Sequence, residues 1–156
     1  MGFGLSFAIG FALIEQPDLP MNYNELIQLY FERSNALQAY WTLYVVIVGG
    51  LLAFSSLRKE SSALTTALVS ILFALFAFEN LTAIQNTASQ RFATLDAIKK
   101  SEGTTAEVAR LREPLEPTLN PASLSSTRTT HLVSDVLTIA ALWAMELRRR
   151  KASTSS

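Results

Sequence analysis

Several ionisable side chains stand inside or at the ends of long apolar stretches, where burying a charge is costly. His131 and Asp135 are four residues apart, so a helix would place both on one face. Glu79 interrupts an earlier apolar stretch and is followed by Asn80. One imidazole and two carboxylates could bind a divalent cation or relay protons. The alternative is that His131 and Asp135 form a hydrogen-bonded pair that fixes helix packing and does no chemistry.

Signatures of catalysis are lacking in this sequence. Its 156 residues include no cysteine and one histidine, which excludes thiolate chemistry and multi-histidine metal or haem sites within them. The G-x-S-x-G, H-E-x-x-H, phosphate-loop and Rossmann patterns are also missing. We therefore expect no catalytic residues and no enzymatic activity, and no cofactor is indicated. A membrane enzyme that uses these acids with a metal is a weaker alternative.

Three apolar stretches are long enough to carry these residues across a membrane, which takes roughly 20 residues. The first has no charged residue, the second has only Glu79, and the third has Asp135 and Glu146. We expect Glu146 to pair with Arg149 and Arg150 at the surface. The sequence predicts an all-α integral membrane protein with a single domain over 1–156 and three transmembrane helices in a bundle. These helices are placed at about 37–57, 62–82 and 131–147.

Helical patterns continue beyond two of these spans. Asn22 and Glu25 have capping-box spacing and predict a helix from Tyr23. The apolar periodicity after Glu79 predicts that the second helix extends to Ser101. The third helix is expected to start at Asn120-Pro121 and to continue through its span. Antiparallel second and third helices would bring Glu79 and Asn80 level with His131 and Asp135, and both would extend past the membrane on the external side.

The remaining segments are assigned by composition. Thr104 and Glu107 predict a short helix that ends before Pro114. Residues 1–20 are expected to form a short apolar helix on or partly within the membrane, unless Met21 is the true start. The predicted segments are 1–20, an interfacial lead with span 1 (21–60), a long helix with span 2 (61–102), an external connector (103–130), and span 3 with a basic tail (131–156).

Basic residues follow two of the spans closely. Arg58 and Lys59 lie in a short turn after the first span, and residues 148–151 follow the third. Because basic loops stay in the cytoplasm, we predict a multi-pass protein of the plasma (inner) membrane with an external N-terminus and a cytoplasmic C-terminus. The basic tail either binds anionic headgroups or only anchors this topology. Its candidate headgroup-binding residues are Arg148, Arg149, Arg150 and Lys151.

Small residues recur at helical spacing within the spans, as in helices that pack closely in lipid. In the second span they form a stripe, and Glu79 lies on the opposite side with Leu68, Leu72 and Leu75. We predict that the small residues make the helix contacts of a compact bundle. The predicted packing residues are Gly49, Ala53, Ala63, Ala67, Ser70, Ala74 and Ala77.

These features predict a small, non-catalytic membrane protein that is an oligomer or an accessory subunit of a larger membrane assembly. Its expected partners are lipid and either other membrane subunits or copies of itself. Basic and acidic residues balance at 13 each, and no basic stripe indicates nucleic acid. The alternative is an ion- or proton-conducting channel or carrier that uses Asp135, His131 and Glu79. The topology also resembles that of some phage holins, which implies a pore, although the long external connector departs from that pattern.

Overall fold

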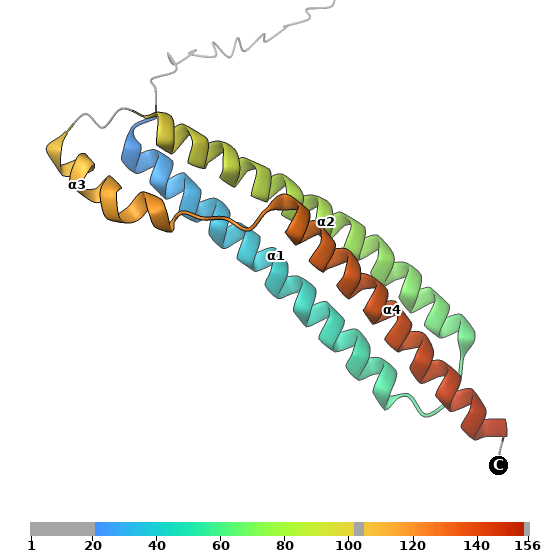
Figure 1. Cartoon of the computed structure of the whole chain (residues 1–156). Coiled ribbons are helices and arrows are strands. Elements are labelled where there is room, and N and C mark those ends of the chain that lie inside the picture. Colours follow the sequence, from blue (N-terminus) through green and yellow to red (C-terminus); the bar gives the residue numbers. More distant parts are fainter. Residues whose placement is uncertain (1–20, 102–104, 155–156) are drawn as a thin grey trace, which may run out of the picture.

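Three long helices lie side by side in the computed structural model, which describes residues 21–101 and 105–154 (Figure 1). They are α1 (Tyr23–Leu57), α2 (Ala63–Lys100) and α4 (Leu124–Thr154). A short helix, α3 (Ala106–Leu115), and a 3-10 turn, η1 (Glu116–Thr118), lie where α1 begins and α2 ends. We call this the α3 end, and the opposite end, with the α1–α2 turn and the end of α4, the turn end. The all-helical prediction is confirmed, whereas the helix expected within 1–20 lies outside the described residues.

The starts of α1 and α2 follow from their caps. The Asn22 side-chain oxygen accepts from the Glu25 N–H at 3.0 Å, and the Glu25 carboxylate accepts from the Asn22 N–H at 2.9 Å. This capping box confirms the predicted start of α1. The Ser62 hydroxyl accepts from the Thr65 N–H at 3.3 Å at the start of α2. As predicted, α2 continues without a break to Lys100, a length of about 57 Å.

Three predicted helix boundaries around the connector are wrong. The final helix begins at Leu124 and not at Asn120-Pro121, because the Ser123 hydroxyl accepts the Ser126 N–H at 3.2 Å and caps the helix there. The short helix is capped by Thr105 and not by Thr104, which lies outside the described residues. It also includes Pro114 and ends one residue later, at Leu115.

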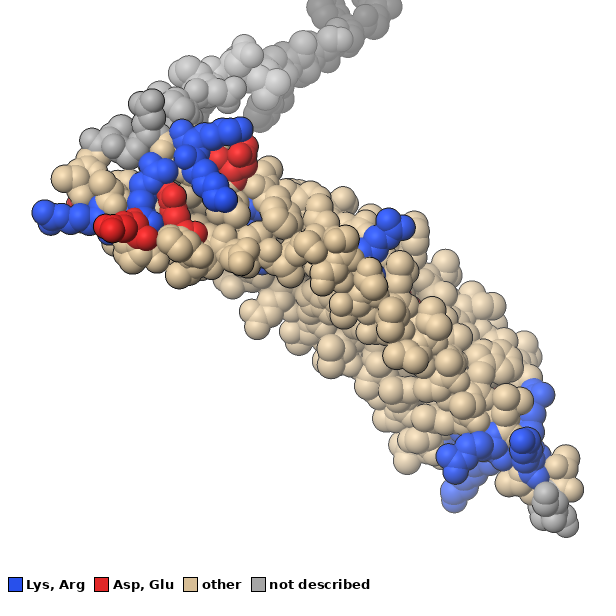
Figure 2. Space-filling view, in the orientation of Figure 1, with Lys and Arg blue, Asp and Glu red and all other residues tan. Residues whose placement is uncertain are grey.

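The three long helices are each long and apolar enough to cross a membrane. Most of their exposed large apolar side chains fall within 43–57 of α1, 64–78 of α2 and 132–147 of α4. These segments form an apolar band about 21 Å tall along each helix. Charged side chains gather mainly at the two ends of the bundle, and only basic ones are visible at the turn end (Figure 2). The molecule therefore has helices of sufficient length and the apolar surface expected of a membrane-spanning bundle.

At the α3 end, the part of α2 beyond the apolar band packs on the first turns of α1. The buried residues there are Tyr23, Leu26, Tyr30, Leu95, Ile98 and Leu119. Arg112 of α3 closes this end: its guanidinium donates to the Ser101 carbonyl at 2.6 Å and to the Ile98 carbonyl at 3.3 Å. It also pairs with Glu116 at 2.7 Å and lies over the Tyr23 ring at 5.4 Å. Burial, with a smaller contribution from the Glu116 carboxylate, raises the pKa of Tyr23.

Candidate functional site

A buried polar cluster joins all three long helices near the α3 end of the apolar band. It consists of Tyr44 of α1, Asn80 of α2, and His131 and Asp135 of α4, and we call it the His131 cluster. The His131 side chain is fully buried. The predicted juxtaposition of Asn80, His131 and Asp135 is therefore present. Helices α2 and α4 position these three residues, and α1 adds Tyr44.

Hydrogen bonds within the His131 cluster use both ring nitrogens. His131 Nδ1 lies 2.9 Å from Asp135 Oδ2, and His131 Nε2 lies 3.1 Å from Asn80 Oδ1. The Tyr44 hydroxyl donates to Asp135 Oδ1 at 2.8 Å. The Asn80 amide nitrogen donates to the Tyr40 carbonyl at 3.3 Å. Each polar atom of these three side chains of α2 and α4 thus has a partner inside the bundle.

Aromatic rings enclose the imidazole on the α1 side. The ring of Tyr44 is 4.3 Å from that of His131, and the ring of Trp41 is 5.6 Å away. From the sequence, the aromatic residues at this end of the span would be placed at the membrane interface, as an aromatic belt. Tyr44 instead is 4% exposed and belongs to the core with Phe73 and Ala77. The spacing of Trp41, Tyr44, Val48 and Leu51, by three and four residues, was the signal for this inward face.

Glu79 does not join the His131 cluster, so its predicted place in an ion or proton site is wrong. Its side chain is exposed, on the same side of α2 as Leu68, Leu72 and Leu75, which are 52%, 66% and 61% exposed. The next residue, Asn80, points into the bundle because one step along a helix turns the side chain by about 100°. Within the described residues, no three His, Asp or Glu side chains group in a way that could hold a metal ion.

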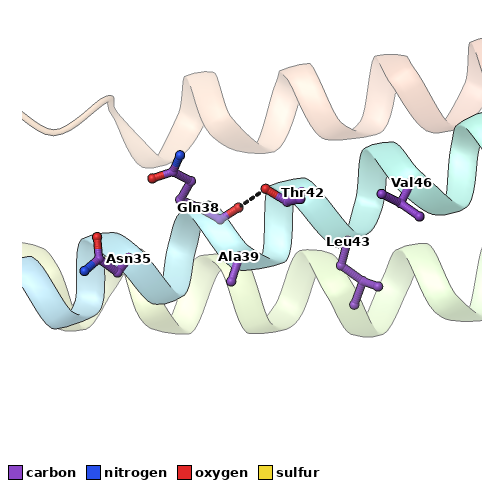
Figure 3. A pocket seen from close by; sticks show the side chains of 6 residues that line it. All are labelled: Asn35, Gln38, Ala39, Thr42, Leu43 and Val46. Carbon is purple, nitrogen blue, oxygen red and sulfur yellow. Dashed lines mark hydrogen bonds between the residues drawn. The ribbon is translucent and has the colours of Figure 1, made fainter.

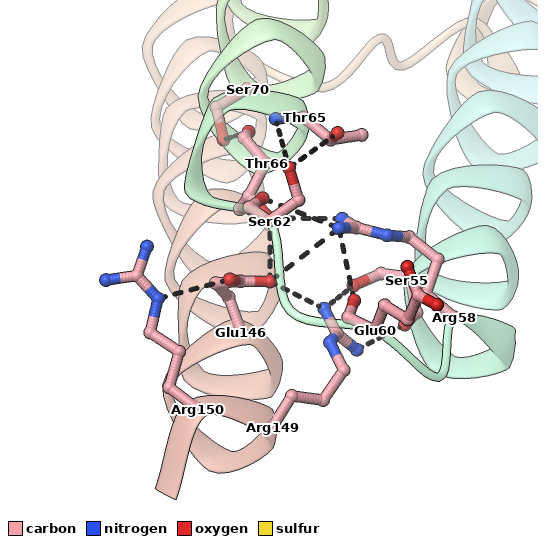
Figure 4. Close-up of polar contacts among 10 residues, drawn as sticks. All are labelled: Ser55, Arg58, Glu60, Ser62, Thr65, Thr66, Ser70, Glu146, Arg149 and Arg150. Atoms are coloured by element: carbon pink, nitrogen blue, oxygen red, sulfur yellow. Dashed lines mark hydrogen bonds and ion pairs between the residues drawn. The ribbon is translucent and has the colours of Figure 1, made fainter. Parts of the chain in front are cut away.

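A second buried cluster joins the three helices at the turn end, around Glu146 (Figure 4). Glu146 is fully buried, so the predicted surface pair is wrong. Its carboxylate accepts from Arg149 at 3.3 Å and Arg150 at 3.2 Å. It also accepts from the Thr66 hydroxyl at 3.2 Å and lies 3.9 Å from Arg58. We call this the Glu146 cluster.

The basic tail is divided between the interior and the surface. Arg149 is 13% exposed and donates to the Ser55 carbonyl at 2.6 Å, so its guanidinium is directed into the bundle, and its predicted headgroup binding is not tested. Arg150 pairs with Glu146 yet remains 44% exposed. Arg148 and Lys151 are exposed. Headgroup binding by Arg148, Arg150 and Lys151 stays a prediction.

The small residues predicted to pack the helices fall into two groups. Ala77 is 3% exposed and lies in the core, and Ala63, Ala67 and Ser70 are half-buried. Gly49, Ala53 and Ala74 are exposed, so they do not make the predicted contacts within this chain. A side chain added at Gly49 would meet no atom within 4 Å.

A shallow groove of about 610 Å³ runs along this exposed side of α1, toward its α3 end (Figure 3). Polar and small side chains line its part nearer the α3 end, and aliphatic ones line the part nearer the turn end. Its lining residues are Asn35, Gln38, Ala39, Thr42, Leu43 and Val46.

No protein-family model, curated protein or solved structure matches this chain. The fold and the site define a bundle of three helices that are long enough to span a membrane, with a buried polar cluster near each end of its apolar band.

Replacing Tyr44 with phenylalanine tests whether the His131 cluster holds the helices together. The variant loses the hydroxyl that donates to Asp135 and keeps the ring that covers His131. We expect a loss of about 1 kcal/mol in unfolding free energy, the usual size for one hydrogen bond between membrane helices. The measurement is denaturant unfolding in mixed micelles. Tyr40→Phe is the matched control, because its hydroxyl makes no hydrogen bond among the described residues; equal losses in both variants would contradict the expectation.

Proposed function

We propose that this chain is a small, non-catalytic helical membrane protein that acts as a subunit of an oligomer or of a larger membrane assembly. The observation that carries the proposal is the outward face of α1. This face consists of Gln38, Thr42, Gly49 and Ala53, which are all exposed, with Gly49 and Ala53 inside the apolar band.

The outward face suits a helix better than it suits lipid. Lipid chains gain little from glycine and alanine, whereas a neighbouring helix can approach closely over them. Gly49 and Ala53 are four residues apart and leave such a space open. The Gln38 side chain adds an exposed amide at the end of the band, where an interhelical hydrogen bond would satisfy it. The opposite side of α1 already packs inside the chain through Trp41, Tyr44 and Val48.

Cysteine crosslinking tests the partner surface, since the natural chain has no cysteine. Thr42→Cys lies on the outward face, and we expect it to form disulfide-linked species in native membranes. Leu72→Cys, on the lipid-facing side of α2, is the control and should not crosslink.

Gly49→Leu should weaken the association by about tenfold, or about 1.4 kcal/mol. Ala74→Leu adds the same bulk at an exposed position of α2 and should have no effect. A strictly monomeric protein with no co-purifying partner would refute the proposal.

The polar cluster favours a structural role over ion conduction. A conducting path needs polar groups that face the moving ion, whereas both nitrogens of His131 and both oxygens of Asp135 are occupied by neighbours. We therefore expect no proton or cation flux above background in liposomes containing the wild-type chain. If the wild-type chain conducts and the Asp135→Asn variant does not, the structural role is refuted and the ion- or proton-conducting alternative is supported.

We further propose that the turn end faces the cytoplasm and the α3 end lies outside, in the plasma (inner) membrane. The turn end carries six basic residues (Arg58, Lys59, Arg148, Arg149, Arg150 and Lys151) and two acidic ones (Glu60 and Glu146), as the positive-inside rule requires. Single cysteines at Ala109 of α3 and Ser61 of the turn test this. An impermeant maleimide should label Ala109→Cys in intact cells. It should label Ser61→Cys only after the cells are permeabilised. The reverse pattern would invert the topology.

A further inference from the structure

The hydrogen bonds around His131 define how many protons its cluster holds. The Asn80 amide nitrogen donates to the Tyr40 carbonyl, which can only accept. This contact fixes the orientation of the amide, so its oxygen, an acceptor, is the atom that faces His131 Nε2 at 3.1 Å. Two acceptors would repel each other at this distance. His131 Nε2 therefore carries a proton.

The other ring nitrogen faces a carboxylate oxygen at 2.9 Å. A hydrogen bond at this distance needs one proton between Nδ1 and Asp135 Oδ2. The proton resides either on the imidazole, which is then a cation beside a carboxylate, or on the carboxyl, which then donates to a neutral ring. Both arrangements leave Asp135 Oδ1 free to accept from Tyr44. In both, His131 and Asp135 together hold two protons and have no net charge.

The groups around the pair do not offer a counter-charge. From α1 it meets the neutral hydroxyl of Tyr44, and from α2 it meets the neutral amide of Asn80. The neighbouring acid Glu79 is exposed on the lipid side. On α4, and in the described residues generally, no lysine or arginine forms an ion pair with Asp135. Losing the shared proton would thus leave one uncompensated negative charge among three helices, which is strongly unfavourable.

We propose that the His131 cluster is a proton-binding site, in which one proton shared by His131 Nδ1 and Asp135 Oδ2 locks α1, α2 and α4 together. Asn80 and Tyr44 are positioning residues that hold the two partners in place. The Glu146 cluster differs, because there three arginines surround one carboxylate and no proton needs to be shared. This proposal is independent of the outward face of α1 and goes beyond a subunit role: it makes the packing of the bundle depend on proton occupancy.

The proposal has a definite pH consequence. In the unfolded chain above pH ~7, an ordinary histidine and aspartate together hold one proton, whereas the folded cluster holds two. Unfolding therefore releases one proton, and the folded state loses stability as pH rises. The equilibrium constant for folding should fall about tenfold per pH unit between about pH 7 and 9. Stability that is flat or rises over this interval would overturn the proposal.

The single histidine makes a direct test possible, because 15N-histidine labelling reports only on His131. In lipid nanodiscs at neutral pH, we expect the full chain to show a protonated Nε2 and a hydrogen-bonded Nδ1. A bare Nε2 at neutral pH would overturn the proposal.

Asp135→Asn is the matched variant for the pH slope. Its amide can donate to Nδ1 and accept from Tyr44, so the hydrogen bonds are kept while the shared proton is absent. We expect its folding equilibrium to become independent of pH over the same interval, and a wild-type slope would overturn the proposal. If this variant does not fold, the wild-type nitrogen signals still decide the question.

Discussion

The structure depends on the requirement that polar groups inside an apolar bundle find their partners within the chain. Lipid offers no hydrogen bonds, so each unpaired buried group would cost several kcal/mol. The chain meets this requirement at two heights, fully in the His131 cluster and for the Glu146 carboxylate, whereas the Nε atom of Arg149 is buried without a hydrogen-bond partner among the described residues. Asn80 and Thr66 mark the two heights on α2, about 21 Å apart. Each cluster draws partners from all three long helices, so a shift of one helix breaks contacts at both.

The two clusters solve the same problem with different chemistry. At the turn end an excess of arginine surrounds Glu146, and the surplus positive charge lies near the end of the apolar band. At the other end the partners are neutral or neutralise each other, and aromatic rings cover the imidazole. Each cluster thereby fixes the axial position of the helices relative to one another. Because the two clusters use different chemical groups, the residues of one do not fit as partners in the other.

The sequence predicted the elements better than their contacts. Apolar length, the Asn22 cap and the long periodicity of α2 were local signals, and the structure confirmed them. The juxtaposition of Asn80 with His131 followed from antiparallel helices of known length. The face of α1 could not be assigned in the same way. Gly49 and Ala53 offered one stripe and Trp41 and Tyr44 another, and in lipid small residues do not by themselves indicate which partner they will contact.

The burial of individual charged side chains could also not be predicted from neighbouring residues in the sequence. Glu146 lies next to Arg149 and Arg150 in the sequence, which suggested an exposed pair. Its remaining partners, Thr66 and Arg58, come from segments about 80 residues away and are known only once the helices are docked. Glu79 and Asn80 show the converse, because one of these adjacent residues is exposed and the other is buried, and a small error in helical phase exchanges them.

The unbroken length of α2 gives the bundle a mechanical property. About 30 Å of continuous helix separate Asn80 in the polar cluster from Lys100 at the α3 end. A tilt of about 10° at the level of Asn80 would displace the far end by about 5 Å. Arg112 of α3 donates hydrogen bonds to carbonyls at the end of α2, so α3 would move together with that end. A small change in helix packing at the level of His131 would thus appear as a larger movement at the α3 end.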